Sequence, residues 1–227
     1  MEKKNKEENI LSQAEIEEEL RLAEIDERPA NFKGKVLANL ILNGRTIETS
    51  LDLEAAIILN AISLESALIK GDLNLNYAVT KGVFYFGSGI LQGNLNLENA
   101  KINGGVNLVG AKITGSLFLN GLNINGFLSL AKIQLKGNLE SPNLKIMDSY
   151  HGGLIVKGDV YLREANIIGR VNLEKSFSEG SGDFLNAFIG KELNLKETVF
   201  ENFLILKGAK IRGETILEGT KYKELIK

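Results

Sequence analysis

Glycine recurs at every eleventh position through the middle of the chain, and this repeat constrains the fold more than any other feature of the sequence. The series slips once by one residue after Gly137 and then resumes: Gly71, Gly82, Gly93, Gly104, Gly115, Gly126, Gly137, then Gly158, Gly169, Gly180 and, later in the same phase, Gly213. Asn60 stands one repeat before Gly71. Asn tolerates a positive φ better than other non-glycine residues, so we predict that the series marks a turn with a left-handed backbone.

Apolar residues alternate with polar ones between these glycines. In the unit that starts at Gly93, Leu95 and Leu97 flank Asn96, while Ala100 and Ile102 flank Lys101. Such alternation predicts a very short strand with both apolar side chains turned inward. A strand this short buries too little area to be stable alone, so the units must stack and pair along an axis. We therefore predict an all-β solenoid, a single-stranded parallel β-helix, over residues 30–227.

Four triplets in these units resemble the small-x-apolar core of pentapeptide-repeat proteins: Ala100-Lys101-Ile102, Ala111-Lys112-Ile113, Ala165-Asn166-Ile167 and Ala209-Lys210-Ile211. The resemblance covers roughly residues 40–220 and implies a right-handed, four-sided β-helix. The repeat of that family is a pentapeptide, whereas intervals of five and six alternate in this chain. A four-sided coil would then take about 22 residues, and a flattened, two-sided coil of about 11 residues fits the same periodicity.

Residues 1–29 lack the repeat and are predicted to form an acidic tail and a short helix within residues 6–27. Ile16, Leu20 and Ala23 follow helical spacing, and Pro29 stands shortly beyond them. The segment contains ten acidic and five basic residues, a net charge of −5, so the remaining residues carry +3 in a chain of net charge −2. Such a helix could bind a partner or cap the open end of the first coil, and we favour the cap.

Two polar excursions are predicted, at residues 147–153 and 174–184, the second in place of one strand. Loops on a rigid scaffold often carry binding residues, although a tolerated insertion fits equally well. The first excursion holds the single histidine, His151, beside Tyr150 and Asp148. An enzyme working from this loop would need a further carboxylate from another coil.

The residue content argues against an enzyme and against a bound metal or cofactor. The chain has no cysteine and only one histidine, which excludes disulfides and thiolate zinc sites. It also lacks the nucleophile elbow of hydrolases and the phosphate-binding loop of nucleotide-binding proteins. We predict a non-catalytic protein with no cofactor.

Three aromatic residues are predicted to face outward, because each lies between two inward apolar residues: Tyr85, Phe118 and Tyr161. Phe118 and Tyr161 are predicted to share one face, two coils apart, with Glu140 between them. Exposed aromatic side chains can anchor a partner. Together with Tyr150 and His151, these residues are the candidates for binding.

The expected function is an interaction scaffold whose ligand is another protein. The net charge of −2 argues against general nucleic-acid binding, and no apolar stretch suggests a signal peptide or membrane span, so we expect a cytoplasmic protein. The C-terminal EGTKYKELIK offers little capping, which suggests a homodimer through the last coil or a self-assembling structural protein. The family resemblance implies a further alternative, a gyrase-directed DNA mimic, which would require an acidic stripe on one face of the rod.

Overall fold

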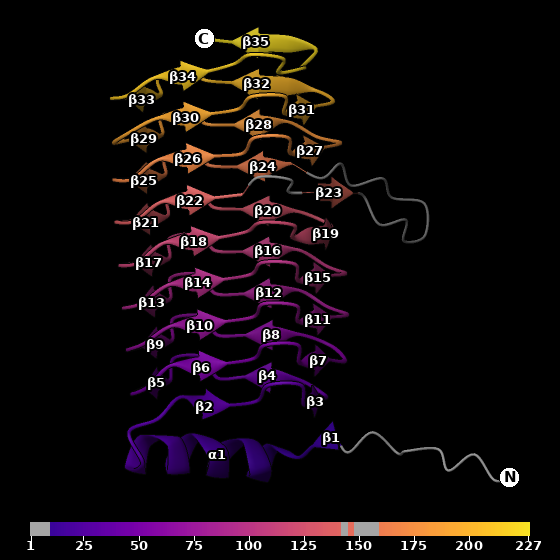
Figure 1. The fold of residues 1–227 in the computed structure, drawn as a ribbon, viewed down its shortest axis with the longest axis vertical. Coiled ribbons are helices and arrows are strands. Elements are labelled where there is room, and N and C mark those ends of the chain that lie inside the picture. Colours follow the sequence, from indigo (N-terminus) through magenta and orange to yellow (C-terminus); the bar gives the residue numbers. More distant parts are fainter. Residues whose placement is uncertain (1–9, 142–144, 148–158) are drawn as a thin grey trace, which may run out of the picture.

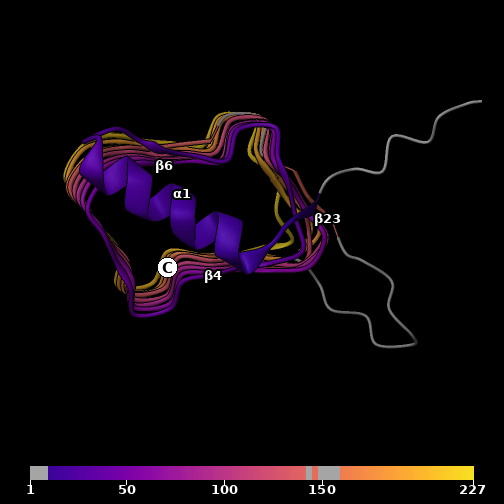
Figure 2. The ribbon, with the colours of Figure 1, turned by 90° about the horizontal axis from the view of Figure 1, so that it is seen from below.

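The chain winds into a right-handed, four-sided parallel β-helix with a helix at its N-terminal end (Figure 1). This computed structural model describes residues 10–141, 145–147 and 159–227. One coil takes 22 residues, so that Leu73 pairs with Leu95 and Leu95 with Leu117. Seen from the N-terminal end, the chain runs clockwise from side to side as it recedes, which is the right-handed sense (Figure 2). The predicted four-sided coil is confirmed, and the two-sided alternative is wrong.

Each side of the coil is one parallel sheet, and we name the sheets A to D. Sheet A contains β1 (Ile10–Leu11), β3 (Val36–Leu37), β7 (Ile57–Ile58), β11 (Val79–Thr80), β15 (Lys101–Ile102), β19 (Asn123–Asn125), β23 (Lys145–Met147), β27 (Phe177–Ser178) and β31 (Val199–Phe200). Sheet B contains β2 (Ala30–Asn31), β6 (Leu51–Asp52), β10 (Leu73–Asn74), β14 (Leu95–Asn96), β18 (Leu117–Phe118), β22 (Leu139–Glu140), β26 (Val171–Asn172), β30 (Leu193–Asn194) and β34 (Thr215–Ile216).

The other two sheets complete the coil, and the chain passes the four sides in the order B, A, C, D. Sheet C contains β4 (Leu40–Ile41), β8 (Ile62–Ser63), β12 (Phe84–Tyr85), β16 (Val106–Asn107), β20 (Leu128–Ser129), β24 (Val160–Tyr161), β28 (Gly182–Asp183), β32 (Phe203–Ile205) and β35 (Glu224–Ile226). Sheet D contains β5 (Thr46–Ile47), β9 (Leu68–Ile69), β13 (Ile90–Leu91), β17 (Lys112–Ile113), β21 (Gln134–Leu135), β25 (Asn166–Ile167), β29 (Phe188–Ile189) and β33 (Lys210–Ile211).

Inward side chains stack in register and form one continuous core. The column on sheet B is typical, and all of its members are fully buried: Leu51, Leu73, Leu95, Leu117, Leu139, Val171 and Leu193. Ala100 and Ala111, the small residues of the predicted triplets, are also buried. The alternation of polar and apolar residues therefore predicted the core correctly.

The glycines of the repeat do not adopt the left-handed backbone predicted for them. The φ angle lies outside the left-handed range at eight glycines of the series: Gly71, Gly82, Gly93, Gly104, Gly115, Gly137, Gly169 and Gly213. Gly126 has a φ of 157°, which is nearly extended. A side chain at these corners would collide with the coil below: a Cβ on Gly93 would lie 2.6 Å from the carbonyl oxygen of Gly71 and 2.7 Å from the nitrogen of Asp72. These glycines therefore relieve the close approach of two backbones, and Lys191 and Asn202 occupy the same corners in later coils.

The left-handed turns form a second series, which mostly falls at every eleventh position as well. Their φ values lie between 54° and 68°, and chemically varied residues occupy them: Gly34, Gly44, Ala55, Ser66, Tyr77, Ser88, Asn99, Gly110, Gly121, Lys132, Glu164, Lys175, Asn186, Glu197, Gly208 and Gly219. Left-handed backbone costs a non-glycine residue about 1–2 kcal/mol. The coil tolerates this at each turn because the strands on both sides are paired.

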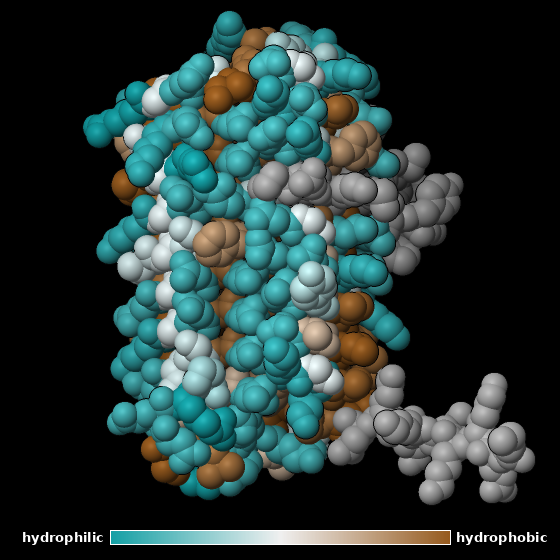
Figure 3. Space-filling view, viewed as in Figure 1, coloured by the Kyte–Doolittle hydropathy of each residue, from teal (hydrophilic) through white to brown (hydrophobic). Residues whose placement is uncertain are grey.

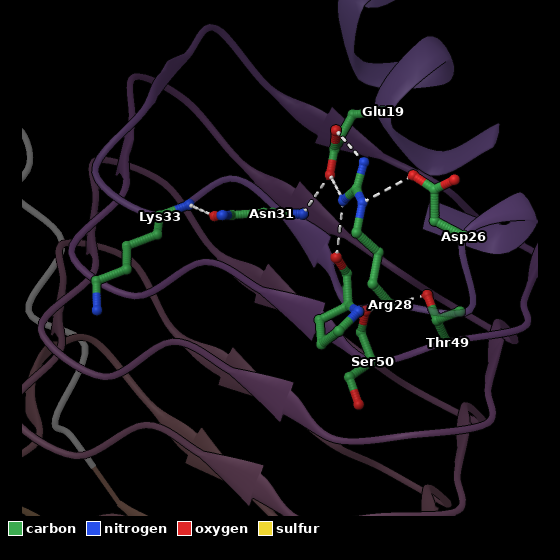
Figure 4. A network of polar contacts seen from close by, with 8 residues as sticks. Glu19, Asp26, Arg28, Asn31, Lys33, Thr49 and Ser50 are labelled. Carbon is green, nitrogen blue, oxygen red and sulfur yellow. Dashed lines mark hydrogen bonds and ion pairs between the residues drawn. The ribbon is translucent and has the colours of Figure 1, made fainter. Parts of the chain in front are cut away.

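Helix α1 (Gln13–Ile25) lies across the N-terminal end of the coil (Figure 2). It starts at Ser12, whose side chain forms a capping box with Glu15, and it buries Ile16 and Ala23 against the first coil. Glu19 connects the helix to sheet B: its carboxylate accepts the N–H of Asn31 at 2.7 Å and pairs with Arg28 at 2.5 Å (Figure 4).

The interruption predicted near residue 147 is an insertion, and the slip in the glycine series comes from it. From β23 to β24 the chain takes ten residues more than from β19 to β20 in the preceding coil. In consequence the N–H of Arg170 bonds to Asn138, 32 residues earlier, where one coil normally takes 22. Residues 148–153 of this predicted excursion, with Tyr150 and His151, lie outside the described residues, and so does Gly158.

The second predicted excursion, at residues 174–184, is wrong. The segment continues the coil through β27 and β28, both in register with their neighbours. Ser178 and Gly182 are buried where other coils have larger apolar residues. The ring of Phe200, one coil later, fills the space, because a Cβ on Gly182 would lie 2.6 Å from it. The small residues Ser178 and Gly182 therefore occupy core positions, and the larger side chain of Phe200 fills the space that they leave.

Candidate interaction surfaces

The three aromatic candidates lie on two opposite sides of the coil. Phe118 is on sheet B, stacked between Asn96 and Glu140, as predicted. Tyr85 and Tyr161 are both on sheet C, and all three side chains are half-buried by their neighbours in the ladder. The prediction that Phe118 and Tyr161 share a face is wrong, because the ten-residue insertion moves Tyr161 to the opposite sheet.

Tyr161 belongs to a polar cluster that connects two coils of sheet C. Its hydroxyl donates to Oδ2 of Asp159 at 2.6 Å, and this hydrogen bond, together with burial, raises the pKa of Tyr161 to about 12. Arg163 donates from Nε and Nη2 to Oδ2 of Asp183, at 3.1 and 2.6 Å. Asp183 is only 2% exposed. Each charge and hydroxyl in the cluster has a partner, so the cluster holds coils together and offers no free reactive group.

Most outward Asn and Asp side chains of sheets B and C are also occupied by the coil itself. In each case a side-chain oxygen accepts the backbone N–H two residues later: Asn31, Asp52, Asn74, Asn96, Asn107, Asn172, Asp183 and Asn194. At one corner, Asp72, Asn94, Ser116 and Asn138 each accept the N–H of a residue one coil later. These polar side chains therefore stabilise the turns.

Sheet D differs, because its polar side chains in the middle of the rod make no such bonds. The side chains of Lys112, Gln134, Lys136 and Asn166 have no hydrogen-bond or ion-pair partner within the described part of the chain. They surround a shallow hollow of about 360 Å³, with Ile90 and Ile168 beside them, 40% and 51% exposed. We call these six residues the sheet D patch. No pattern in the sequence pointed to it, because its members come from four coils and the insertion separates Asn166 and Ile168 from the others.

Charge is distributed unequally between sheets D and B. The strands of sheet D and the residue after each strand carry five basic residues and one acidic one: Lys70, Lys112, Lys136, Lys210, Arg212 and Glu48. For sheet B we count the strands and the second residue after each strand, which lies in the turn. Among the described residues, these positions carry six acidic and two basic residues: Asp52, Glu54, Glu98, Glu140, Glu174, Glu218, Lys33 and Lys196. Figure 3 shows the face formed by sheet B as predominantly hydrophilic.

The C-terminal end of the coil leaves apolar side chains partly exposed. Ile211 is half-buried, whereas Ile189, one coil earlier in the same column, is 0% exposed. Leu206, Leu217 and Leu225 are likewise only partly buried against the core. In the described part of the chain no helix lies across this end, in contrast to the N-terminal end (Figure 1).

Comparison with known proteins identifies no relative of this chain. No family model matches it, and it matches neither a curated protein nor a solved structure. The resemblance to pentapeptide-repeat proteins therefore stays a prediction, with which the four-sided coil is compatible. Among the residues described, no grouping of three or more His, Cys, Asp or Glu could hold a metal ion. No helix in the same residues is long and apolar enough to span a bilayer.

Proposed function

We propose that this protein is a non-catalytic scaffold that binds another protein through the sheet D patch. The observation that carries the proposal is the contrast between this patch and the outward faces of sheets B and C. Most outward Asn and Asp side chains of sheets B and C bond to the coil, whereas Lys112, Gln134, Lys136 and Asn166 offer free hydrogen-bonding groups around one hollow, between two exposed isoleucines. A cytoplasmic location and the absence of a cofactor stay predictions from the sequence.

The dimensions and charge of the patch suit an acidic protein segment with an apolar anchor. Ile90, Lys112, Gln134 and Asn166 stand on successive strands, so the patch extends about 14 Å along the axis at about 4.8 Å per strand. Interfaces typically combine apolar anchors with a polar rim. The described lining of the hollow holds two lysines and no acidic residue. A long nucleic acid suits it less well, because sheet B of the same rod is acidic.

Affinity capture with matched charge reversals tests this function. The double variant Lys112→Glu, Lys136→Glu changes the patch, while Lys81→Glu, Lys101→Glu makes the same charge change on exposed lysines of sheet A. After capture from the native lysate and chemical cross-linking, we expect a stoichiometric partner that the patch variant loses by about tenfold and the control retains. Equal retention by both variants would place binding elsewhere, and capture of no partner would remove the scaffold function.

Self-association through the C-terminal end is a second candidate function, favoured by the partly exposed Leu206, Ile211, Leu217 and Leu225. Two such ends could bury these residues against each other in a closed dimer. Light scattering across a concentration series should give a dimer mass that Leu217→Glu reduces to the monomer. A monomer at every concentration would remove this candidate.

A gyrase-directed DNA mimic is a third candidate, favoured by the excess of acidic residues on sheet B. Four of its acidic residues are paired, however, in Lys33–Glu54, Arg170–Glu140, Lys175–Glu174 and Lys196–Glu218. This leaves a weaker acidic stripe than the residue count suggests. A supercoiling assay with DNA gyrase decides the question: inhibition that is lost in Glu98→Gln, Glu174→Gln would support the mimic, and no inhibition would dispose of it.

A further inference from the structure

Sheet D has an open edge at the N-terminal end of the coil. The first coil supplies one strand to each sheet: β2, β3, β4 and β5. At the N-terminal end, β1 extends sheet A, and the carboxylate of Glu19 caps the N–H of Asn31 on sheet B. β5 is the edge strand of sheet D and, in the part of the chain that the structure describes, has no strand before it.

The unpaired edge of β5 presents two backbone donors. In sheet D each strand donates its N–H groups to the coil before it: Leu68 donates to the carbonyl of Arg45 at 2.8 Å, and Lys70 donates to that of Ile47 at 3.0 Å. The equivalent donors one coil earlier are the N–H groups of Thr46 and Glu48, which have no backbone acceptor among the residues that the structure describes. Thr46 and Glu48 are both exposed. An exposed sheet edge of this kind can pair with an added strand.

Helix α1 leaves a trough beside this edge. A hollow of about 540 Å³ lies between residues 14–24 of the helix and residues 45–49 of the coil. A second hollow, of about 490 Å³, continues it toward Pro29 and shares Glu24, Glu48 and Thr49 with the first. The trough therefore follows the helix, whose 13 residues extend about 20 Å, the length of about six extended residues.

The first hollow is lined by four acidic and two basic side chains. Arg21 pairs with Glu18 at 2.7 Å, and Arg45 pairs with Glu17 at 3.1 Å. Glu48 pairs with Lys70 outside this hollow, and Glu24 has no ion-pair partner among the described residues. The excess of two negative charges favours an occupant with positive side chains.

We infer that this trough binds an extended, basic segment of a partner protein, which adds to β5 as the ninth strand of sheet D. The segment accepts hydrogen bonds from the N–H groups of Thr46 and Glu48 and places Lys or Arg side chains near Glu24 and Glu48. This is recognition by strand addition, in which the backbone supplies affinity and alternate side chains supply specificity. The site shares no residue with the sheet D patch, so it stands independently of the proposed function.

A synthetic peptide tests this inference directly. The probe is a fluorescein-labelled Lys-Val-Lys-Val-Lys-Val peptide, with two matched controls: the same peptide with Glu in place of Lys, and the same peptide N-methylated at alternate backbone positions. We expect saturable binding of the probe and at least about tenfold weaker binding of both controls. Equal binding of the N-methylated peptide would mean that charge alone attracts the probe, and would overturn strand addition.

Variants of β5 separate the backbone donor from the side chain. Thr46→Val keeps the N–H and should change the affinity by less than about twofold, whereas Thr46→Pro removes the donor and should weaken binding by about tenfold. Unchanged binding by a folded Thr46→Pro variant would contradict the inference. Lys112→Glu, Lys136→Glu should leave peptide binding unchanged, because the sheet D patch lies elsewhere.

Amide hydrogen exchange of the unmodified chain decides the case if the proline variant does not fold. Saturating probe peptide should slow exchange at the amides of Thr46 and Glu48 by about tenfold or more, while an exposed residue at the other end, Thr215, should not change. Protection at Thr46 and Glu48 supports the inference, and binding without protection there overturns it.

Discussion

Arg163 donates two hydrogen bonds to a single oxygen of Asp183, one coil further along sheet C. The arginine side chain is half-exposed, whereas that of Asp183 is 3% exposed. The other carboxylate oxygen accepts the N–H of Leu185 at 2.9 Å, so the aspartate has a partner on both sides. The ion pair thus allows a buried charge at a position where the coil otherwise carries neutral residues such as Asn107 and Ser129.

Removing Arg163 should destabilise the rod at this point. Arg163→Met leaves one oxygen of a buried carboxylate without its donor, which we expect to lower the free energy of unfolding by about 1–3 kcal/mol. Lys132→Met is the matched control, because Lys132 pairs with Glu164 at 3.7 Å with both side chains exposed. Urea denaturation measures both variants. Equal stability of the two variants would show that Asp183 does not depend on its arginine.

Tyr161 should make stability depend on alkaline pH. Because its pKa is raised to about 12 from an ordinary value of 10, mainly by the hydrogen bond to Asp159, the folded chain keeps the phenol protonated where the unfolded chain loses the proton. This contribution is fully present below pH 10 and is lost as pH rises through 12. We expect Asp159→Asn to lower the pKa, measured by the ultraviolet absorbance of phenolate in comparison with Tyr161→Phe. An unchanged titration in Asp159→Asn would assign the shift to burial.

The strands and the core columns followed from the sequence, because period and hydrophobic alternation reflect the coil directly. The number of sides did not follow from the period, because a two-sided coil fits it equally well. The assignment of faces did not follow. Leu139 stacks on Val171 although the coil between them contains ten extra residues. In an 11-residue repeat, inserting ten residues shifts the later glycines to the same positions within the repeat as deleting one residue would. The sequence pattern therefore cannot distinguish the two. The opposite sheets B and C are themselves offset by one such repeat in the sequence. Phase alone therefore could not place Tyr161 on its sheet.

The surfaces were harder to predict than the fold for a related reason. The polar side chains of the sheet D patch lack partners among the described residues, and the β5 edge is open because, unlike β3 of sheet A, it has no described strand before it. Neither the unpartnered side chains nor the open strand edge can be recognised from a residue type or a spacing in the sequence. The buried Ser178 and Gly182 misled the prediction in the same way, since the residue that completes their part of the core, Phe200, comes from the next coil.

Replacement of Gly93 should show why glycine is favoured at this corner: because two backbones approach closely, or because the backbone is left-handed. Gly93→Ala and Gly93→Asn both add a Cβ that would lie 2.6 Å from the carbonyl oxygen of Gly71, so both should lower stability by about 1–3 kcal/mol. If the glycine were needed for a positive φ, the asparagine variant would be tolerated much better than the alanine variant. Thermal and urea unfolding of the two variants provide the comparison, and a stable Gly93→Asn protein would contradict the collision.

Glu19 should control the stability of the N-terminal end more than that of the rod as a whole. Its carboxylate accepts the N–H of Asn31 and pairs with Arg28, which is the main reason why the pKa of Glu19 is lowered (Figure 4). Glu19→Ala leaves the edge of β2 uncapped, and a loss of about 1 kcal/mol would raise amide exchange in the first coil by about fivefold.

Glu24→Ala is the matched control on the same helix, since the Glu24 side chain has no ion pair within the described residues. Exchange in the last coil should not change in either variant, because each coil of a solenoid contacts only its neighbours. The lowered pKa of Glu19 gives a second test: its contribution is present above the ordinary pKa of a glutamate and is lost as pH falls through the lowered value. The difference in first-coil exchange between Glu19→Ala and the unmodified chain should therefore shrink in acid. A difference that persists at low pH would mean that the ionised carboxylate is not what holds the helix to sheet B.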